Sequence, residues 1–152
     1  MRKLWFSLLA IFLISVTACS SNSETVVTED GSTVTASTVN VYMNEWEVKV
    51  DPNYKMGKHI KPGKLTLTLS NEGALEHSLI LLNNNKHEDL VLMADGTMVD
   101  ESKLDILGRI DTIQPGGTGQ LDVDDLQAGV YAFLCNIPGH YELGMVYKII
   151  AR

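Results

Sequence analysis

Hydrophobic and polar residues alternate along much of the chain after Thr38. The period of two is clearest at Leu65, Leu67 and Leu69, and recurs at Val39, Val41 and Met43. Such alternation is typical of β-strands with one buried face. Further strands are expected over Leu75 to Leu82, Thr118 to Val123, Gly129 to Cys135 and Gly144 to Ile150. Many short strands separated by Pro-Gly turns predict an all-β sandwich or barrel.

Two features interrupt this pattern. The segment from Asn83 to Asp111 is the least regular part of the chain, and we expect a crossover excursion there with a short helix near Glu101 to Leu107. Trp46 lies in a segment that continues the first strand. Because an aromatic residue in an alternating strand normally packs inward, we expect Trp46 in the core.

The N-terminus has the features of a bacterial lipoprotein signal. Arg2 and Lys3 precede an apolar run from Leu4 to Val16, and Cys19 follows the small residues Thr17 and Ala18. The run of about 13 residues is too short to cross roughly 30 Å of hydrocarbon as a transmembrane helix. We therefore expect residues 1–18 to be a signal peptide and Cys19 to be the site of lipid attachment.

The residues that follow predict a tether and then one domain. Residues 19–37 are rich in Ser and Thr and too polar to bury much core, which favours a flexible tether, although an edge strand near Thr33 to Val41 fits the same residues. Residues 38–152 are enough for one domain. Without Arg2 and Lys3, 10 basic and 19 acidic residues remain, a formal net charge of −9. This charge disfavours nucleic-acid binding.

One segment carries the candidate chemistry. Cys135, His140 and Met145 follow one another at intervals of five residues between two predicted strands. Pro138 and Gly139 suit the centre of a type II turn, which would fold His140 and Met145 back towards the sulfur. If Cys19 is acylated, Cys135 is a lone thiol in an oxidising compartment and cannot form an internal disulfide. The segment therefore predicts a soft metal site.

A fourth ligand has to come from elsewhere in the chain. His77 is an imidazole in the otherwise apolar strand around Leu79, and it is the natural remote ligand. Two imidazoles, one thiolate and a weak, distant thioether suit copper in both its Cu(I) and Cu(II) states. We expect one copper ion held by His77, Cys135, His140 and Met145.

The segment from Cys135 to Met145 resembles the copper loop of the cupredoxins, the type 1 blue-copper proteins, with a spacing like that of auracyanins and rusticyanins. The likeness covers roughly Thr38 to Arg152. It implies a Greek-key β-sandwich and a type 1 copper site formed by the four residues just named. Ser78 is a departure, because many cupredoxins have asparagine directly after the first histidine. We expect Ser78 and Asn136 to form hydrogen bonds around the ligands and to influence the reduction potential.

The resemblance also implies an apolar surface for partner docking around His140. Four residues of the loop are candidates for it: Ile137, Pro138, Tyr141 and Leu143. A small apolar surface gives short-lived contacts, which an electron carrier needs in order to leave its partner quickly.

Electron transfer outside the cytoplasm is the function that these features favour. Redox partners such as c-type cytochromes or membrane oxidases and reductases are family expectations, and we expect a monomer. A copper carrier or sequestering lipoprotein is the alternative. Such proteins usually have clustered Met or His residues, which this sequence lacks. An oxidase or nitrite reductase would need more histidines than the four present, and the chain has no His-x-His pair. Ser20 after Cys19 favours the periplasmic face of an outer membrane in a Gram-negative cell.

Overall fold

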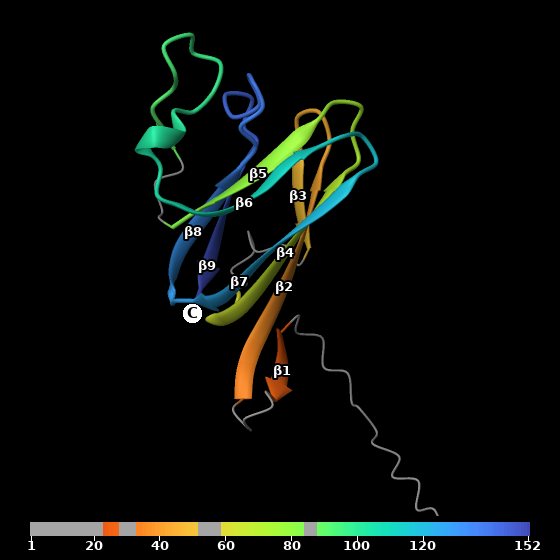
Figure 1. Ribbon diagram of the computed structural model, residues 1–152, viewed down its shortest axis with the longest axis vertical. Helices are drawn as coiled ribbons and strands as arrows, with labels where there is room; N and C mark the ends of the chain where they lie inside the picture. The colour runs from red at the N-terminus through yellow and green to blue at the C-terminus, as the bar shows by residue number, and fades with distance from the viewer. Residues whose placement is uncertain (1–22, 28–32, 52–58, 84–87) are drawn as a thin grey trace, which may run out of the picture.

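The computed structural model describes residues 23–27, 33–51, 59–83 and 88–152. Its strands form two sheets, shown in Figure 1. The first contains β1 (Ser23–Val27), β2 (Thr33–Met43), β3 (Val48–Asp51), β4 (Gly63–Asn71) and β7 (Thr118–Leu126). The second has the order β6 (Ile106–Ile113), β5 (His77–Leu82), β8 (Gly129–Leu134) and β9 (Val146–Ala151). The predicted all-β Greek-key sandwich is confirmed.

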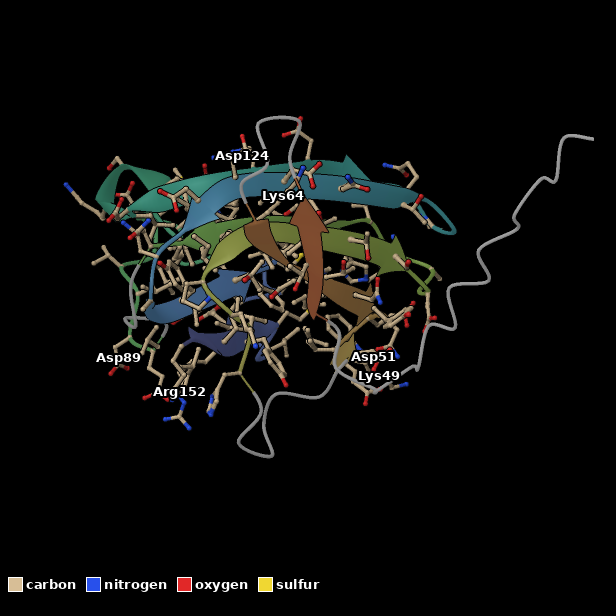
Figure 2. The ribbon with its side chains drawn as sticks, turned by 90° about the horizontal axis from the view of Figure 1, so that it is seen from below. Lys49, Asp51, Lys64, Asp89, Asp124 and Arg152 are labelled. Atoms are coloured by element: carbon tan, nitrogen blue, oxygen red, sulfur yellow. The ribbon has the colours of Figure 1, made fainter. Side chains whose placement is uncertain are left out.

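The main core lies between the two sheets, and the alternation in the sequence explains it. Leu65, Leu67 and Leu69 of β4 are fully buried, whereas Thr66 and Thr68 between them are partly exposed. The second sheet contributes its own buried residues to the same cluster, among them Leu79, Leu81, Tyr131, Phe133 and Ile149. Charged side chains such as Lys64 and Asp124 point outward from the sheets (Figure 2). This packing fixes which face of each strand is internal.

Strand β5 is buried on both faces. Leu79 and Leu81 join the main core, whereas Ile80 and Leu82 join a second cluster on the outer face of the sheet. The irregular segment after β5 covers that face, contributing Val99 and several partly buried leucines. The predicted excursion therefore exists, and its apolar residues seal the second sheet.

Three details differ from the sequence prediction. The helix expected near Glu101 to Leu107 is a 3-10 helix of three residues, Glu101–Lys103. Strand β6 begins at Ile106, inside the segment expected to be irregular, because it completes the second sheet beside β5. Strand β1 lies where a flexible tether is expected, because it pairs antiparallel with β2; the start of β2 at Thr33 agrees with the alternative of a strand near Thr33 to Val41.

Several loops lie together at one end of the sandwich (Figure 1). Backbone hydrogen bonds join them. The N–H of Glu72, after β4, donates to the carbonyl of Met43, at the end of β2, over 2.8 Å. The N–H of Gly116, between β6 and β7, donates to the carbonyl of Asn71 over 3.0 Å. Cys135, directly after β8, reaches this same end. The segments after β2, β4 and β6 are therefore joined to one another at the end where Cys135 lies.

Candidate metal centre

His77 and Cys135 come from neighbouring strands of the second sheet. His77 is the first residue of β5, and Cys135 directly follows β8. The two strands pair antiparallel, with Ile80 opposite Leu134. Strand pairing therefore brings together two residues that are 58 positions apart in the sequence.

The loop after Cys135 returns His140 and Met145 to the same point. His140 N–H donates to the carbonyl of Ile137 over 3.0 Å, and Gly139 has the positive φ of 83° that a type II turn needs. Met145 N–H donates to the carbonyl of His140 over 3.1 Å. The N–H of Cys135 donates to the carbonyl of Met145 over 3.0 Å and closes the loop. The turn expected from Pro138 and Gly139 is formed.

The three strong donors meet in a small buried group. The Nδ1 atoms of His77 and His140 lie 3.8 and 3.4 Å from Sγ of Cys135. The three ligand atoms all lie within 4.8 Å of one another. His77 and Cys135 are fully buried and His140 is 3 % exposed. Polar side chains rarely gather in a core without a shared partner.

These distances fit one metal ion in a trigonal site. With metal–nitrogen bonds of about 2.0 Å and a metal–sulfur bond of about 2.3 Å at 120°, each nitrogen lies about 3.7 Å from the sulfur. The two observed separations lie on either side of this value. Met145 is also fully buried and packs in the core cluster that contains Cys135. A trigonal thiolate and two imidazoles, with a methionine beside them, are the donors of a type 1 copper site.

Burial sets the protonation of the donors before any metal binds. It lowers the pKa of His77, and the nearby His140 lowers it further, so the imidazole is neutral and its lone pair is available. Burial also lowers the pKa of His140, against the opposing charge of Glu76. Burial raises the pKa of the Cys135 thiol, although the Ser78 N–H opposes this. A metal that binds here therefore displaces the thiol proton.

Ser78 lies beside the sulfur and is hydrogen-bonded to Asn136. The Ser78 N–H donates to Sγ of Cys135 over 3.3 Å, and the Ser78 hydroxyl lies 3.9 Å from the same sulfur. The backbone N–H of Asn136 donates to the Ser78 hydroxyl over 3.3 Å. The residue that departs from the usual asparagine therefore still contacts both the ligand and the loop.

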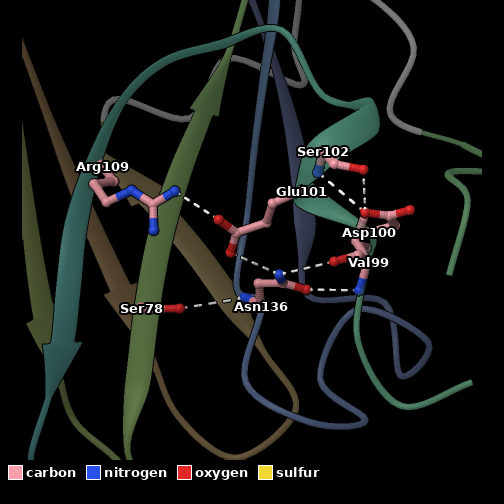
Figure 3. A network of polar contacts seen from close by, with 7 residues as sticks. All are labelled: Ser78, Val99, Asp100, Glu101, Ser102, Arg109 and Asn136. Carbon is pink, nitrogen blue, oxygen red and sulfur yellow. Dashed lines mark hydrogen bonds and ion pairs between the residues drawn. The ribbon is translucent and has the colours of Figure 1, made fainter. Parts of the chain in front are cut away.

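The Asn136 side chain connects the ligand loop to the excursion (Figure 3). Its Oδ1 accepts from the N–H of Val99 over 2.8 Å, and its Nδ2 donates to the Val99 carbonyl over 3.2 Å. The same Nδ2 donates to Oε1 of Glu101 over 3.0 Å, and Glu101 is paired with Arg109 over 2.6 Å. Sequence reasoning did not identify Glu101 or Arg109, because nothing in their local sequence indicates this contact.

The four residues expected to form a docking surface are not equally placed for it. Leu143 is 56 % exposed and Pro138 is also exposed, whereas Ile137 is partly buried against the main core. Tyr141 packs against the second cluster, and its hydroxyl accepts from the N–H of Leu90 over 3.1 Å. Docking by these residues stays a prediction, and the geometry favours Pro138 and Leu143.

The prediction for Trp46 is wrong. The residue is 55 % exposed, and its ring meets the ring of His140 edge to face, with centroids 5.7 Å apart at 72°. Residues 44–47 are a loop between β2 and β3, in which Asn44 Oδ1 accepts from the N–H of Glu47 over 3.1 Å. Asn44 was the available signal, since its side chain favours turns over continued strands.

The fold and this donor set define a cupredoxin with a site for one type 1 copper ion. The chain matches the model of the sulfocyanin (SoxE) domain over residues 18–152, and it belongs to this family. The predicted signal peptide and Cys19 lie outside the described residues, as do residues 20–22 and 28–32 of the predicted tether. Within the described part, no helix has the length and apolar character needed to cross a bilayer.

Solved structures of copper proteins share the fold. Dithionite-reduced auracyanin from Roseiflexus castenholzii is 18 % identical with a TM-score of 0.55, covering 76 % of this chain and 96 % of its own. Auracyanin A from Chloroflexus aurantiacus is 20 % identical with a TM-score of 0.53, covering 77 % and 99 %. Rusticyanin from Thiobacillus ferrooxidans is 20 % identical with a TM-score of 0.53, covering 86 % and 88 %. No curated protein sequence matches the chain significantly.

Proposed function

We propose that this protein carries single electrons between redox proteins of the cell envelope, using one type 1 copper ion held by His77, Cys135, His140 and Met145. The observation that carries the proposal is the burial of the donors, since none of the four is more than 3 % exposed. A substrate that binds to a metal needs an open coordination position. An electron needs none, because it can pass through the ligands.

Rigidity of the donor frame supports the same function. His77 begins β5 and Cys135 directly follows β8, its paired strand, and backbone hydrogen bonds hold the loop that carries His140 and Met145. Copper in such a site supplies a one-electron couple between Cu(II) and Cu(I). When the ligands move little between the two states, the reorganisation energy that opposes electron transfer is small.

The same burial argues against a copper carrier or sequestering protein. Handing over a metal ion requires a ligand of the acceptor to reach it while a donor leaves. His140, the most exposed donor, is only 3 % exposed and contacts the Trp46 ring, and the other donors are fully buried. A storage role would not need the hydrogen bond from Ser78 to the sulfur.

Spectroscopy of the copper-loaded protein tests the proposal. The chain from Ser20 onward contains every described residue, and it can be loaded with Cu(II). We expect an intense blue absorption band and a narrow copper hyperfine splitting in the electron paramagnetic resonance spectrum. Both should be lost in Cys135→Ser, and a reductant should bleach the band reversibly. A colourless or pale wild-type protein that binds copper would contradict electron transfer and favour the carrier.

We also propose that Cys19 is acylated and anchors the protein outside the cytoplasm, at the periplasmic face of the outer membrane. There the protein is a monomer and exchanges electrons with c-type cytochromes or membrane oxidases and reductases. The support is the order of the basic, apolar and small residues before Cys19. Labelling with a radioactive fatty acid tests the anchor. Wild-type protein should be labelled and sediment with membranes, and Cys19→Ala should lose the label.

A further inference from the structure

Trp46 is an exposed aromatic residue in contact with one of the metal ligands. Its ring contacts the His140 ring, which in turn lies 5.0 Å from the His77 ring between centroids. His140 is 3 % exposed, whereas Trp46 is 55 % exposed. A partner at this end of the sandwich therefore meets the indole of Trp46 before it meets a ligand imidazole.

The loop that carries Trp46 is held in place. Asn44 Oδ1 accepts from the N–H of Glu47 over 3.1 Å and from that of Trp46 over 3.4 Å. The Glu45 carboxylate accepts from the N–H of Ala74, in the loop between β4 and β5. A Cβ added to Gly73 would lie 3.0 Å from Cα of Asn44, so the two loops are in close contact. The backbone that carries the indole is thus held against the loop between β4 and β5.

Apolar side chains are exposed on the loops beside Trp46. Leu143, which is 56 % exposed, is three residues after His140, and its N–H donates to the carbonyl of Gly139. Leu75, which is 43 % exposed, follows Ala74 in the loop bonded to Glu45. We call these three residues, Trp46, Leu75 and Leu143, the end patch. Aromatic anchors within apolar surfaces are typical of protein contacts.

The same loops are strongly acidic. Residues 44–47, 72–76 and 136–145 contain five glutamates and no lysine or arginine: Glu45, Glu47, Glu72, Glu76 and Glu142. Lys49, just beyond the first loop, pairs with Glu47 over 3.3 Å. An apolar patch with a rim of carboxylates attracts a surface of opposite charge and repels an acidic one.

We propose that electrons enter and leave through Trp46, and that the end patch and its carboxylates receive a redox protein whose cofactor edge is ringed by lysine or arginine. This inference rests on the proposed electron-transfer function. In the step, one electron moves from the reduced partner to Cu(II), giving Cu(I) and the oxidised partner. No bond forms, no proton moves, and Trp46 provides contact without being oxidised itself.

Rapid-mixing kinetics of the copper-loaded protein with a reduced, lysine-ringed c-type cytochrome test the role of Trp46. We expect Trp46→Ala to lower the second-order rate about tenfold or more, since loss of a central aromatic anchor costs about 1.4 kcal/mol or more. Trp46→Phe should recover most of the rate. Leu107→Ala removes an exposed leucine at the far end of β6 and should leave the rate unchanged. Reduction potentials of all variants are measured, so that rates are compared at equal driving force.

The charge of the rim is tested separately. Glu72→Gln with Glu142→Gln should lower the rate with the cationic cytochrome several-fold at low ionic strength and flatten its salt dependence. The double variant should react faster with anionic hexacyanoferrate. Asp124→Asn, near the opposite end of β7, should change neither rate.

The outcomes separate this inference from the proposed function. A wild-type protein without the blue band would overturn both. A blue wild type that exchanges electrons rapidly, with Trp46→Ala equally fast at equal driving force, would overturn the role of Trp46 alone. An unchanged salt dependence in the double glutamine variant would overturn the cationic partner.

Discussion

The backbone N–H of Ser78 donates to Sγ of Cys135 over 3.3 Å, joining the start of β5 to the end of β8 at the metal ligand itself. The hydroxyl of Ser78 accepts from the N–H of Asn136, which leaves its own proton free to point at the same sulfur, 3.9 Å away. Hydrogen bonds to a thiolate weaken its donation to Cu(II) and favour the reduced metal. Ser78 is therefore placed to raise the reduction potential.

Ser78→Ala should lower the potential. The variant keeps the backbone hydrogen bond and loses the hydroxyl contact. At about 0.5–1 kcal/mol for one hydrogen bond, and about 59 mV per 1.4 kcal/mol for one electron, the expected decrease is about 20–40 mV. A redox titration followed at the blue band measures it. An unchanged potential in both Ser78→Ala and Ser78→Asn would remove the role assigned to this side chain.

The parts that the sequence predicted well are those determined by local pattern. The alternation of Leu65, Leu67 and Leu69 with threonine follows from the buried and exposed faces of β4. The spacing of Cys135 and His140 places both donors on one loop, in which Gly139 has the positive φ that the turn requires. Such features depend on near neighbours in the chain, and their residue types indicate them directly.

The parts that it did not predict depend on distant contacts. Strand β6 contains the polar residues Arg109 and Asp111, and it is a strand because β5 pairs with it. The local sequence of Trp46 indicates a core residue, and its contact with His140 becomes visible only in the folded structure. Glu101 becomes a partner of Asn136 when the excursion folds over the second sheet. Contacts between residues far apart in the sequence have little effect on the local pattern of hydrophobic and polar residues.

Asn136→Ala should destabilise the protein far more than its size indicates. Asn136 is 4 % exposed, and its amide satisfies both the N–H and the carbonyl of Val99, which is 1 % exposed. Leaving two buried backbone groups unpaired costs about 2–4 kcal/mol. Urea unfolding of the copper-loaded protein measures this loss. Glu101→Gln is the matched control, since its partly exposed ion pair with Arg109 contributes less than about 1 kcal/mol; equal costs would contradict the argument.

Gly119→Ala should destabilise the contact between the two sheets. A Cβ at this position of β7 would lie 2.4 Å from Cγ2 of Ile110 and 2.7 Å from Cδ1 of Ile113, both on β6. Overpacking of this kind costs about 1–3 kcal/mol. The neighbouring substitution Thr118→Ala, at an exposed position, should cost less than about 1 kcal/mol. Thermal unfolding of the two variants compares them, and similar melting temperatures would show that β6 moves aside without cost.

Met145→Leu should preserve the fold and the blue colour while raising the potential. Met145 is fully buried among core residues, and leucine has a similar volume, so the expected loss of stability is less than about 1.5 kcal/mol. The thiolate of Cys135 supplies the charge-transfer band and is unchanged. The thioether stabilises Cu(II) more than Cu(I), because the more positive ion gains more from an added donor. Its replacement by a hydrocarbon should therefore raise the potential by at least about 60 mV, the equivalent of a tenfold preference for one electron.

Voltammetry of the wild type and the variant measures the difference, with His140→Ala as a contrast that should lose the blue site altogether. A potential equal to that of the wild type would mean that the Met145 sulfur is not a ligand, and that the two imidazoles and the thiolate alone determine the couple.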